Sequence, residues 1–153
     1  MFNSTKKKGE RFIAPKVKNF IYYKIYKRRF KMKCIMLVDD SDVIRNIVAH
    51  TLGMHSYKNV IMARDGLEAL EIIKKESGNI CMYILDVNMP KMDGLTLLQE
   101  IRKIDKTHPI IMLTTETDKE KINKAKDLGA TGWIIKPFDS EKFIKVIDMY
   151  LRA

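Results

Sequence analysis

Short apolar runs alternate with longer amphipathic segments from Cys34 onward, and this alternation is the feature that most constrains the fold. Each unbroken apolar run predicts a strand buried on both faces, which indicates a parallel sheet covered by helices. The predicted strands are 34–38, 60–63, 82–85, 110–113 and 133–135. The predicted helices are about 42–53, 66–76, 94–104, 118–128 and 140–151, with Asp65 and Ser140 as candidate N-caps.

Five alternating strand–helix units predict an open α/β sandwich. A barrel would need about eight such units and a longer chain. We therefore expect three layers, with a doubly wound five-stranded parallel sheet in the middle. In such a sheet, ligands bind beyond the carboxyl ends of the strands, so the residues that follow each strand are candidate ligand-binding residues.

Polar side chains follow four of these strands, at ends expected to share one edge of the sheet. The carboxylates of Asp39, Asp40 and Asp86 meet the hydroxyl of Thr114 and the ammonium of Lys136 there. Clustered carboxylates repel one another unless a cation lies among them, and Mg²⁺ binds such oxygen ligands. The lysine and the threonine can hold the oxygens of a phosphoryl group. The pattern predicts in-line transfer of a phosphoryl group to a carboxylate.

The residues around these positions form ordered motifs. They are Val38-Asp39-Asp40-Ser41, the segment 85–94 (LDVNMPKMDG), Leu113-Thr114-Thr115-Glu116 and Lys136-Pro137-Phe138. Over residues 33–152 the chain resembles the response-regulator receiver family, and within it the stand-alone chemotaxis regulators of the CheY type. The resemblance implies a sheet with strand order 2-1-3-4-5 and a receiver domain over residues 32–153.

The resemblance also implies roles for the acidic residues. Asp86 would be the phospho-acceptor, which receives its phosphoryl group from a histidine kinase. Asp40 and Asp86 would bind Mg²⁺ directly, with the backbone carbonyl of Asn88 as a further ligand and Asp39 acting through water.

Lys136 and Thr114 would, by the same resemblance, bind phosphoryl oxygens, and the bond between Lys136 and Pro137 would be cis. On phosphorylation Thr114 would shift toward the phosphoryl group, and the aromatic ring of Trp133 would rotate inward. These movements would change the face formed by the last two helices and the last strand. Tyrosine is commoner than tryptophan at this position of the family, so the hydrogen bonding of Trp133 stays open.

Asn88 and Glu116 match polar residues that flank the path of the attacking water in CheY-type regulators, so we expect a short-lived acyl phosphate. The protein would act as a regulator that catalyses its own phosphorylation and dephosphorylation, and not as an enzyme with a separate substrate. The implied partners of this monomer are a CheA-like histidine kinase and a FliM-like flagellar switch protein or another protein target. Two alternatives stay open: a phosphorelay intermediate of another pathway, and a haloacid-dehalogenase-like phosphatase with Asp40 as nucleophile.

The net charge of +10 is concentrated in residues 1–31, which hold eleven basic side chains against the single acid Glu10. The remaining 18 basic and 18 acidic side chains balance, so the domain itself has no electrostatic reason to bind nucleic acid. We expect the basic leader to be disordered or to be translated from an upstream start, since Arg28-Arg29 shortly before Met32 could encode a ribosome-binding site. A membrane-binding or nucleic-acid-binding tail is the alternative.

Two cysteines in apolar segments, Cys34 and Cys81, predict buried, reduced thiols and a cytoplasmic protein. No stretch approaches the roughly 18 apolar residues of a membrane span, so none is expected.

Overall fold

The computed structural model describes residues 33–152 except residue 77, and its strands form one parallel sheet. The strands are β1 (Cys34–Val38), β2 (Val60–Ala63), β3 (Ile80–Leu85), β4 (Ile110–Thr114) and β5 (Gly132–Ile135). The helices are α2 (Asp42–Met54), α3 (Gly66–Glu76), α4 (Gly94–Ile104), α5 (Lys119–Asp127) and α6 (Ser140–Leu151). The predictions made for residues 1–31 lie outside the described residues.

The strand order in the sheet is β2-β1-β3-β4-β5, which confirms the expected doubly wound topology. β1 pairs with β2 on one side and with β3 on the other, and Val38 lies opposite Ala63 and Leu85. The chain therefore winds in opposite directions from β1, and the carboxyl ends of β1 and β3 meet at the switch point. This is where an open α/β sheet leaves room for a ligand.

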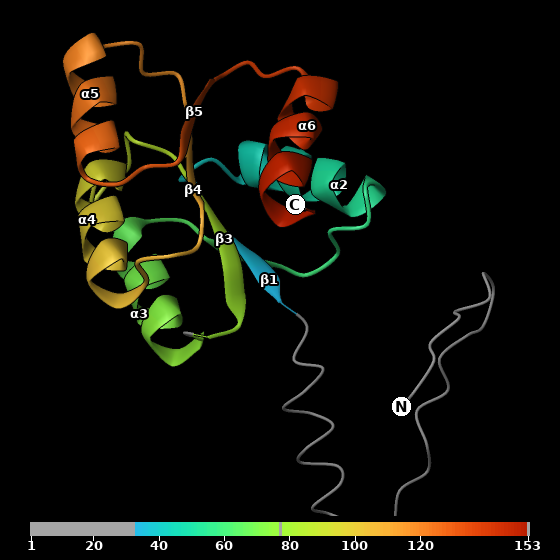
Figure 1. Cartoon of the computed structure of the whole chain (residues 1–153), viewed down its shortest axis with the longest axis horizontal. Helices are drawn as coiled ribbons and strands as arrows, with labels where there is room; N and C mark the ends of the chain where they lie inside the picture. Colours follow the sequence, from blue (N-terminus) through green and yellow to red (C-terminus); the bar gives the residue numbers. More distant parts are fainter. Residues whose placement is uncertain (1–32, 77, 153) are drawn as a thin grey trace, which may run out of the picture. The chain divides into compact units, whose positions relative to one another are not determined.

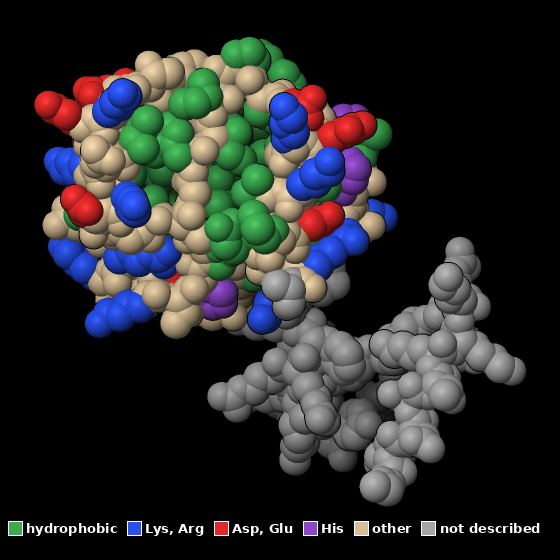
Figure 2. Space-filling model, turned by 45° about the horizontal axis from the view of Figure 1, so that its top comes forward, with side chains coloured by type: hydrophobic (Ala, Val, Ile, Leu, Met, Phe, Trp, Pro, Cys, Tyr) green, Lys and Arg blue, Asp and Glu red, His purple; other side chains and the backbone are tan. Residues whose placement is uncertain are grey.

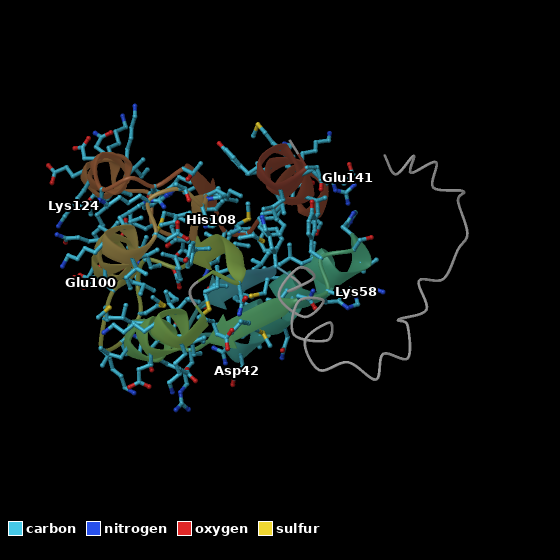
Figure 3. All side chains as sticks on the ribbon, turned by 60° about the horizontal axis from the view of Figure 1, so that its bottom comes forward. Asp42, Lys58, Glu100, His108, Lys124 and Glu141 are labelled. Atoms are coloured by element: carbon cyan, nitrogen blue, oxygen red, sulfur yellow. The ribbon has the colours of Figure 1, made fainter. Side chains whose placement is uncertain are left out.

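Helices cover both faces of the sheet, with α3, α4 and α5 on one side and α2 and α6 on the other (Figure 1). The side chains of β1 alternate between the two cores: Met36 and Val38 join the first, and Ile35 and Leu37 join the second. This explains why the strands are almost continuous apolar runs. The outer faces of the helices carry charged groups such as Lys124 (Figure 3).

Most element boundaries agree with the predictions to within one residue, but the start of β3 and the N-cap of α6 differ. β3 begins at Ile80, two residues earlier than expected, because Ile80 pairs with Cys34 at the start of β1. The N-cap of α6 is Asp139 and not Ser140, since the Asp139 carboxylate accepts a hydrogen bond of 2.8 Å from the backbone N–H of Lys142. A carboxylate at this position also interacts favourably with the helix dipole.

The capping prediction for α3 is confirmed. Asp65 accepts a 2.9 Å hydrogen bond from the backbone N–H of Glu68. Both cysteines are free, but only Cys34 is buried. The prediction of burial is wrong for Cys81, which is half-buried and packs against the core on the α2 and α6 side. None of the helices in the described part of the chain is long and apolar enough to cross a bilayer.

Candidate functional site

Three carboxylates meet where β1 and β3 end side by side. The backbone N–H of Asp86 donates to the carbonyl of Val38, which places Asp86 beside Asp39. Asp39 and Asp86 are buried, whereas Asp40 is exposed at the rim. One oxygen from each of the three carboxylates lies within 4.8 Å of the others. The structure thus brings together the acidic cluster that the sequence predicts.

Lys136 lies between two members of this cluster. It follows β5 directly, and its Nζ lies 2.6 Å from Oδ2 of Asp39 and 3.3 Å from Oδ2 of Asp86. The side chains of Lys136, Asp39 and Asp86 are 10%, 3% and 8% exposed, so this three-way contact is shielded from solvent. The expected cis bond between Lys136 and Pro137 is present.

The carboxyl group of Asp86 has an unusual electrostatic environment. Burial raises its pKa, an effect that Lys136 opposes and the neighbouring Asp39 reinforces. Its Oδ1 accepts a 2.7 Å hydrogen bond from the backbone N–H of Val87, while its Oδ2 faces Lys136. A buried carboxylate with fixed partners on both oxygens is typical of a functional group and not of a strand-end surface residue.

Thr114 supplies a hydroxyl to the same edge. It is the last residue of β4, it is fully buried, and its side chain lowers the pKa of Asp86 by hydrogen bonding. Its Oγ1 also accepts a 3.2 Å hydrogen bond from the backbone N–H of Glu116. The hydroxyl is therefore placed between the Asp86 carboxylate and the loop that follows β4.

A glycine holds the loop between Asp86 and α4 close to the backbone of Asp86. The backbone N–H of Gly94 donates a 2.7 Å hydrogen bond to the carbonyl of Val87, and a Cβ on Gly94 would lie 1.9 Å from the carbonyl oxygen of Asp86. No other residue fits there without displacing the loop. Lys91, in the same loop, has a φ of 67° and pairs with the buried Asp65 at 3.3 Å.

The loop after β4 contains the second group of predicted residues. The Glu116 carboxylate accepts one hydrogen bond from Nζ of Lys121 and another from the backbone N–H of Asp118. These bonds lower its pKa to about 2, with a smaller contribution from the side chain of Asn88. The indole N–H of Trp133 donates a 3.2 Å hydrogen bond to the backbone carbonyl of Glu116. The hydrogen bonding of Trp133, which the sequence leaves open, is thus to this loop.

Sequence reasoning missed two charged residues of the site. Arg45 of α2 donates from Nη1 to the carbonyl of Asp39 at 2.5 Å and pairs with Asp42, one helical turn away. Lys121 of α5 pairs with Glu116. The i,i+3 spacing of Asp42 and Arg45 is a signal that could have been used. The Lys121 contact joins a loop to a helix, and no periodicity in the sequence predicts it.

The donor set fits a hard divalent cation. All three carboxylates offer oxygen, which Mg²⁺ and Ca²⁺ prefer, and the single positive charge of Lys136 offsets only part of their combined negative charge. The rim position of Asp40 leaves one side of the cluster open to water and to a further ligand.

The fold and the site together define a receiver. The model of the response regulator receiver domain matches residues 35–148, and the chain belongs to that family. Its relatives include chemotaxis proteins. Chemotaxis protein CheY-3 of Vibrio cholerae is 37% identical over 116 residues, which cover 74% of this chain and 88% of that protein.

Solved structures give the same result. The structure of chemotaxis protein CheY4 of Vibrio cholerae has 43% identity and a TM-score of 0.71, covering 78% of this chain and 99% of that one. The CheX-CheY-BeF3-Mg+2 complex of Borrelia burgdorferi contains a chain with 30% identity and a TM-score of 0.72, covering 76% of this chain and 87% of that one. The chain is therefore a CheY-like receiver.

Proposed function

We propose that this protein is a CheY-like response regulator that is phosphorylated on Asp86 by a histidine kinase. The observation that carries the proposal is the placement of the buried Asp86 carboxylate between Lys136 and Thr114, beside two further acids. Asp40, the nucleophile of the phosphatase alternative, is exposed and lacks such a setting. Burial and partners therefore favour Asp86 as the acceptor.

Mg²⁺ is the proposed metal, and its ligands would be Asp40, Asp86 and the carbonyl of Asn88, with Asp39 acting through water. The oxygen donors support this choice, as does the relative whose structure contains BeF3 and Mg²⁺. When bound, the ion would neutralise charge on the transferring phosphoryl group.

The chain's own residues support an in-line transfer. An oxygen of the Asp86 carboxylate forms a bond to phosphorus while the phosphorus–nitrogen bond of the kinase phosphohistidine breaks, and the imidazole leaves with the bonding electrons. Lys136 can move from its carboxylate partners to a phosphoryl oxygen, and the Thr114 hydroxyl can donate to another. The protein thereby catalyses its own modification without turning over a separate substrate.

The α5, β5 and α6 face is the proposed output surface. Hydrophobic side chains gather at the centre of the view in Figure 2, between the ends of α5 and α6, with charged groups around them. A hollow of about 300 Å³ between β5 and α6 is lined by Ile134, Phe138 and Val146, among others. A second hollow of about 260 Å³ lies between α5 and β5 and includes Trp133. Trp133 and Thr114 would transmit the phosphorylated state to this face.

The proposed setting is chemotaxis in the cytoplasm, with a CheA-like kinase as phosphodonor and a FliM-like switch protein as target. The names of the CheY relatives and the two free thiols support this setting. Residues 32–153 carry equal numbers of acidic and basic side chains, which favours protein partners over nucleic acid. The alternative is a phosphorelay intermediate of another pathway. Phosphoryl transfer from kinases of the two pathways would distinguish these roles.

The central test is the site of phosphorylation. The full chain is incubated with Mg²⁺ and acetyl phosphate, and peptide mass spectrometry locates the phosphoryl group. We expect it on Asp86 and expect its loss in Asp86→Asn, whereas Asp40→Asn slows the reaction without moving its site. Phosphate on Asp40, or undiminished incorporation in Asp86→Asn, would contradict the proposal.

The pathway and the lifetime need separate measurements. An autophosphorylated CheA-like kinase should transfer its phosphoryl group to the protein within seconds, and a kinase of another pathway should be much slower. The acyl phosphate should then decay in Mg²⁺ buffer without a phosphatase. Persistence for hours would rule out the short lifetime expected from Asn88 and Glu116.

A further inference from the structure

Glu116 joins the proposed phosphorylation site to the proposed output face. Its backbone N–H donates to Oγ1 of Thr114, and its backbone carbonyl accepts from the indole of Trp133. Its carboxylate pairs with Lys121 of α5 at 2.6 Å. One residue therefore contacts β4, β5 and α5. The position of the Glu116 side chain thus depends on Lys121, which is not one of the residues proposed to bind the phosphoryl group.

We infer that Lys121 is a positioning residue that, through Glu116, sets the rate at which the acyl phosphate on Asp86 is hydrolysed. This inference rests on the proposed function, since it concerns the fate of the phosphoryl group at the same site. Within the described part of the chain, Lys121 of α5 forms an ion pair with Glu116 and none with the three acids of the site.

The carboxylate of Glu116 is fixed at both oxygens. Oε2 accepts from Nζ of Lys121, and Oε1 accepts from the backbone N–H groups of Thr117 at 3.1 Å and Asp118 at 3.0 Å. The Glu116 side chain is 17% exposed and that of Lys121 is 42% exposed. These three hydrogen bonds leave the Glu116 carboxylate little rotational freedom.

Asn88, two residues after Asp86, lies close enough to this carboxylate to contribute to the low pKa of Glu116 by hydrogen bonding. In hydrolysis, a water oxygen bonds to phosphorus, the bond between phosphorus and the Asp86 oxygen breaks, and inorganic phosphate leaves with the water proton. A polar group held beside this path orients the water. A side chain that rotates freely orients the water in a smaller fraction of the time. The hydrolysis rate should then fall, because correct orientation of the reactants supplies much of the rate acceleration.

The ion pair between Lys121 and Glu116 is partly exposed and contributes little to the free energy of folding. A substitution of Lys121 can therefore change the hydrolysis rate without unfolding the protein. Lys121→Met keeps the aliphatic stem and removes the charge, and Lys121→Arg keeps the charge. Lys119→Met is the matched control, since Lys119 lies on the same helix and forms no ion pair within the described part of the chain.

The test measures first-order loss of the phosphoryl group from Asp86 after removal of acetyl phosphate. We expect decay to slow about threefold in Lys121→Met, to stay near the original rate in Lys119→Met, and to recover in Lys121→Arg. In a Glu116→Gln background, Lys121→Met should not change the decay rate further, because the carboxylate through which Lys121 acts is absent.

Unchanged or faster decay in Lys121→Met would overturn the inference. The same slowing with and without Glu116 would also overturn it, since Lys121 would then act by another route. These outcomes require that the original chain is phosphorylated on Asp86. If it is not, the proposed function fails first, and the inference falls with it.

Discussion

Replacing Lys136 with methionine would leave the two buried carboxylates that it contacts without their shared cation. Methionine matches the length of the lysine stem, so the change is mainly one of charge and not of volume. Asp39 and Asp86 are each less than one-tenth exposed, and water cannot replace the ammonium group at both. Removing one partner of a buried ion pair costs about 3–5 kcal/mol. We expect a loss of this size in the free energy of unfolding.

The assay is urea denaturation at neutral pH with a chelator present, followed by circular dichroism. With a slope of about 2 kcal/mol per molar urea, the midpoint should fall by about 2 M. Lys145→Met, at an exposed position of α6, is the control and should change the midpoint little. The slope itself should stay constant, because the same surface is exposed on unfolding.

Magnesium supplies a second arm of this experiment. A divalent cation among the three acids replaces part of the lost charge, so saturating Mg²⁺ should stabilise Lys136→Met more than it stabilises the original chain. An ion at 100 times its dissociation constant contributes about 2.7 kcal/mol. An unchanged midpoint in chelator, or equal stabilisation of both proteins by Mg²⁺, would refute the account of Lys136 as the cation that offsets the repulsion of these acids.

Three further substitutions test other parts of the structure. Gly94→Ala should abolish phosphorylation or prevent folding, because its Cβ would overlap the carbonyl oxygen of Asp86; a folded, fully active variant by circular dichroism and phosphorylation would contradict the close approach. Asp105→Ala should cost about 2–3 kcal/mol in urea denaturation, because the hydroxyl of the buried Tyr83 loses its acceptor. Burial raises the pKa of Asp105, but hydrogen bonding outweighs this effect and keeps the pKa below its usual value. The carboxylate therefore stabilises the fold above about pH 4, and this contribution is lost as the pH falls further. The difference in stability between Asp105→Ala and the original chain should shrink in acid. Asp139→Ala should cost about 1 kcal/mol of stability through loss of the α6 cap, whereas Asp139→Ser should cost less.

The periodicity of the apolar residues was enough to predict the sheet and most element boundaries. The periodicity did not predict the start of β3. This strand begins at Ile80, next to polar residues, because Ile80 pairs with Cys34 of the neighbouring strand. The periodicity also failed at Ser140, because two capping residues stand next to each other and the chain path decides between them. Pairing partners and chain paths are tertiary features that a local pattern does not contain.

The acidic cluster was predictable for a different reason. Parallel strands bring their carboxyl ends to one edge, so Asp39, Asp86 and Lys136 had to lie close together once the strands were assigned. The contact of Lys121 with Glu116 depends on side-chain conformations at the junction of a loop and a helix. Nothing in the residue types alone distinguishes Lys121 from the other lysines of α5.

The indole of Trp133 has a practical consequence, because the chain contains a single tryptophan. The ring packs partly buried against the core, and its N–H is bonded to the loop that begins at the Thr114 hydroxyl. Indole emission responds to the polarity around the ring and to its hydrogen bond. The protein therefore carries a single indole beside the loop that the phosphoryl group is proposed to move, so an unlabelled sample excited at the indole band should report that movement as a change in emission.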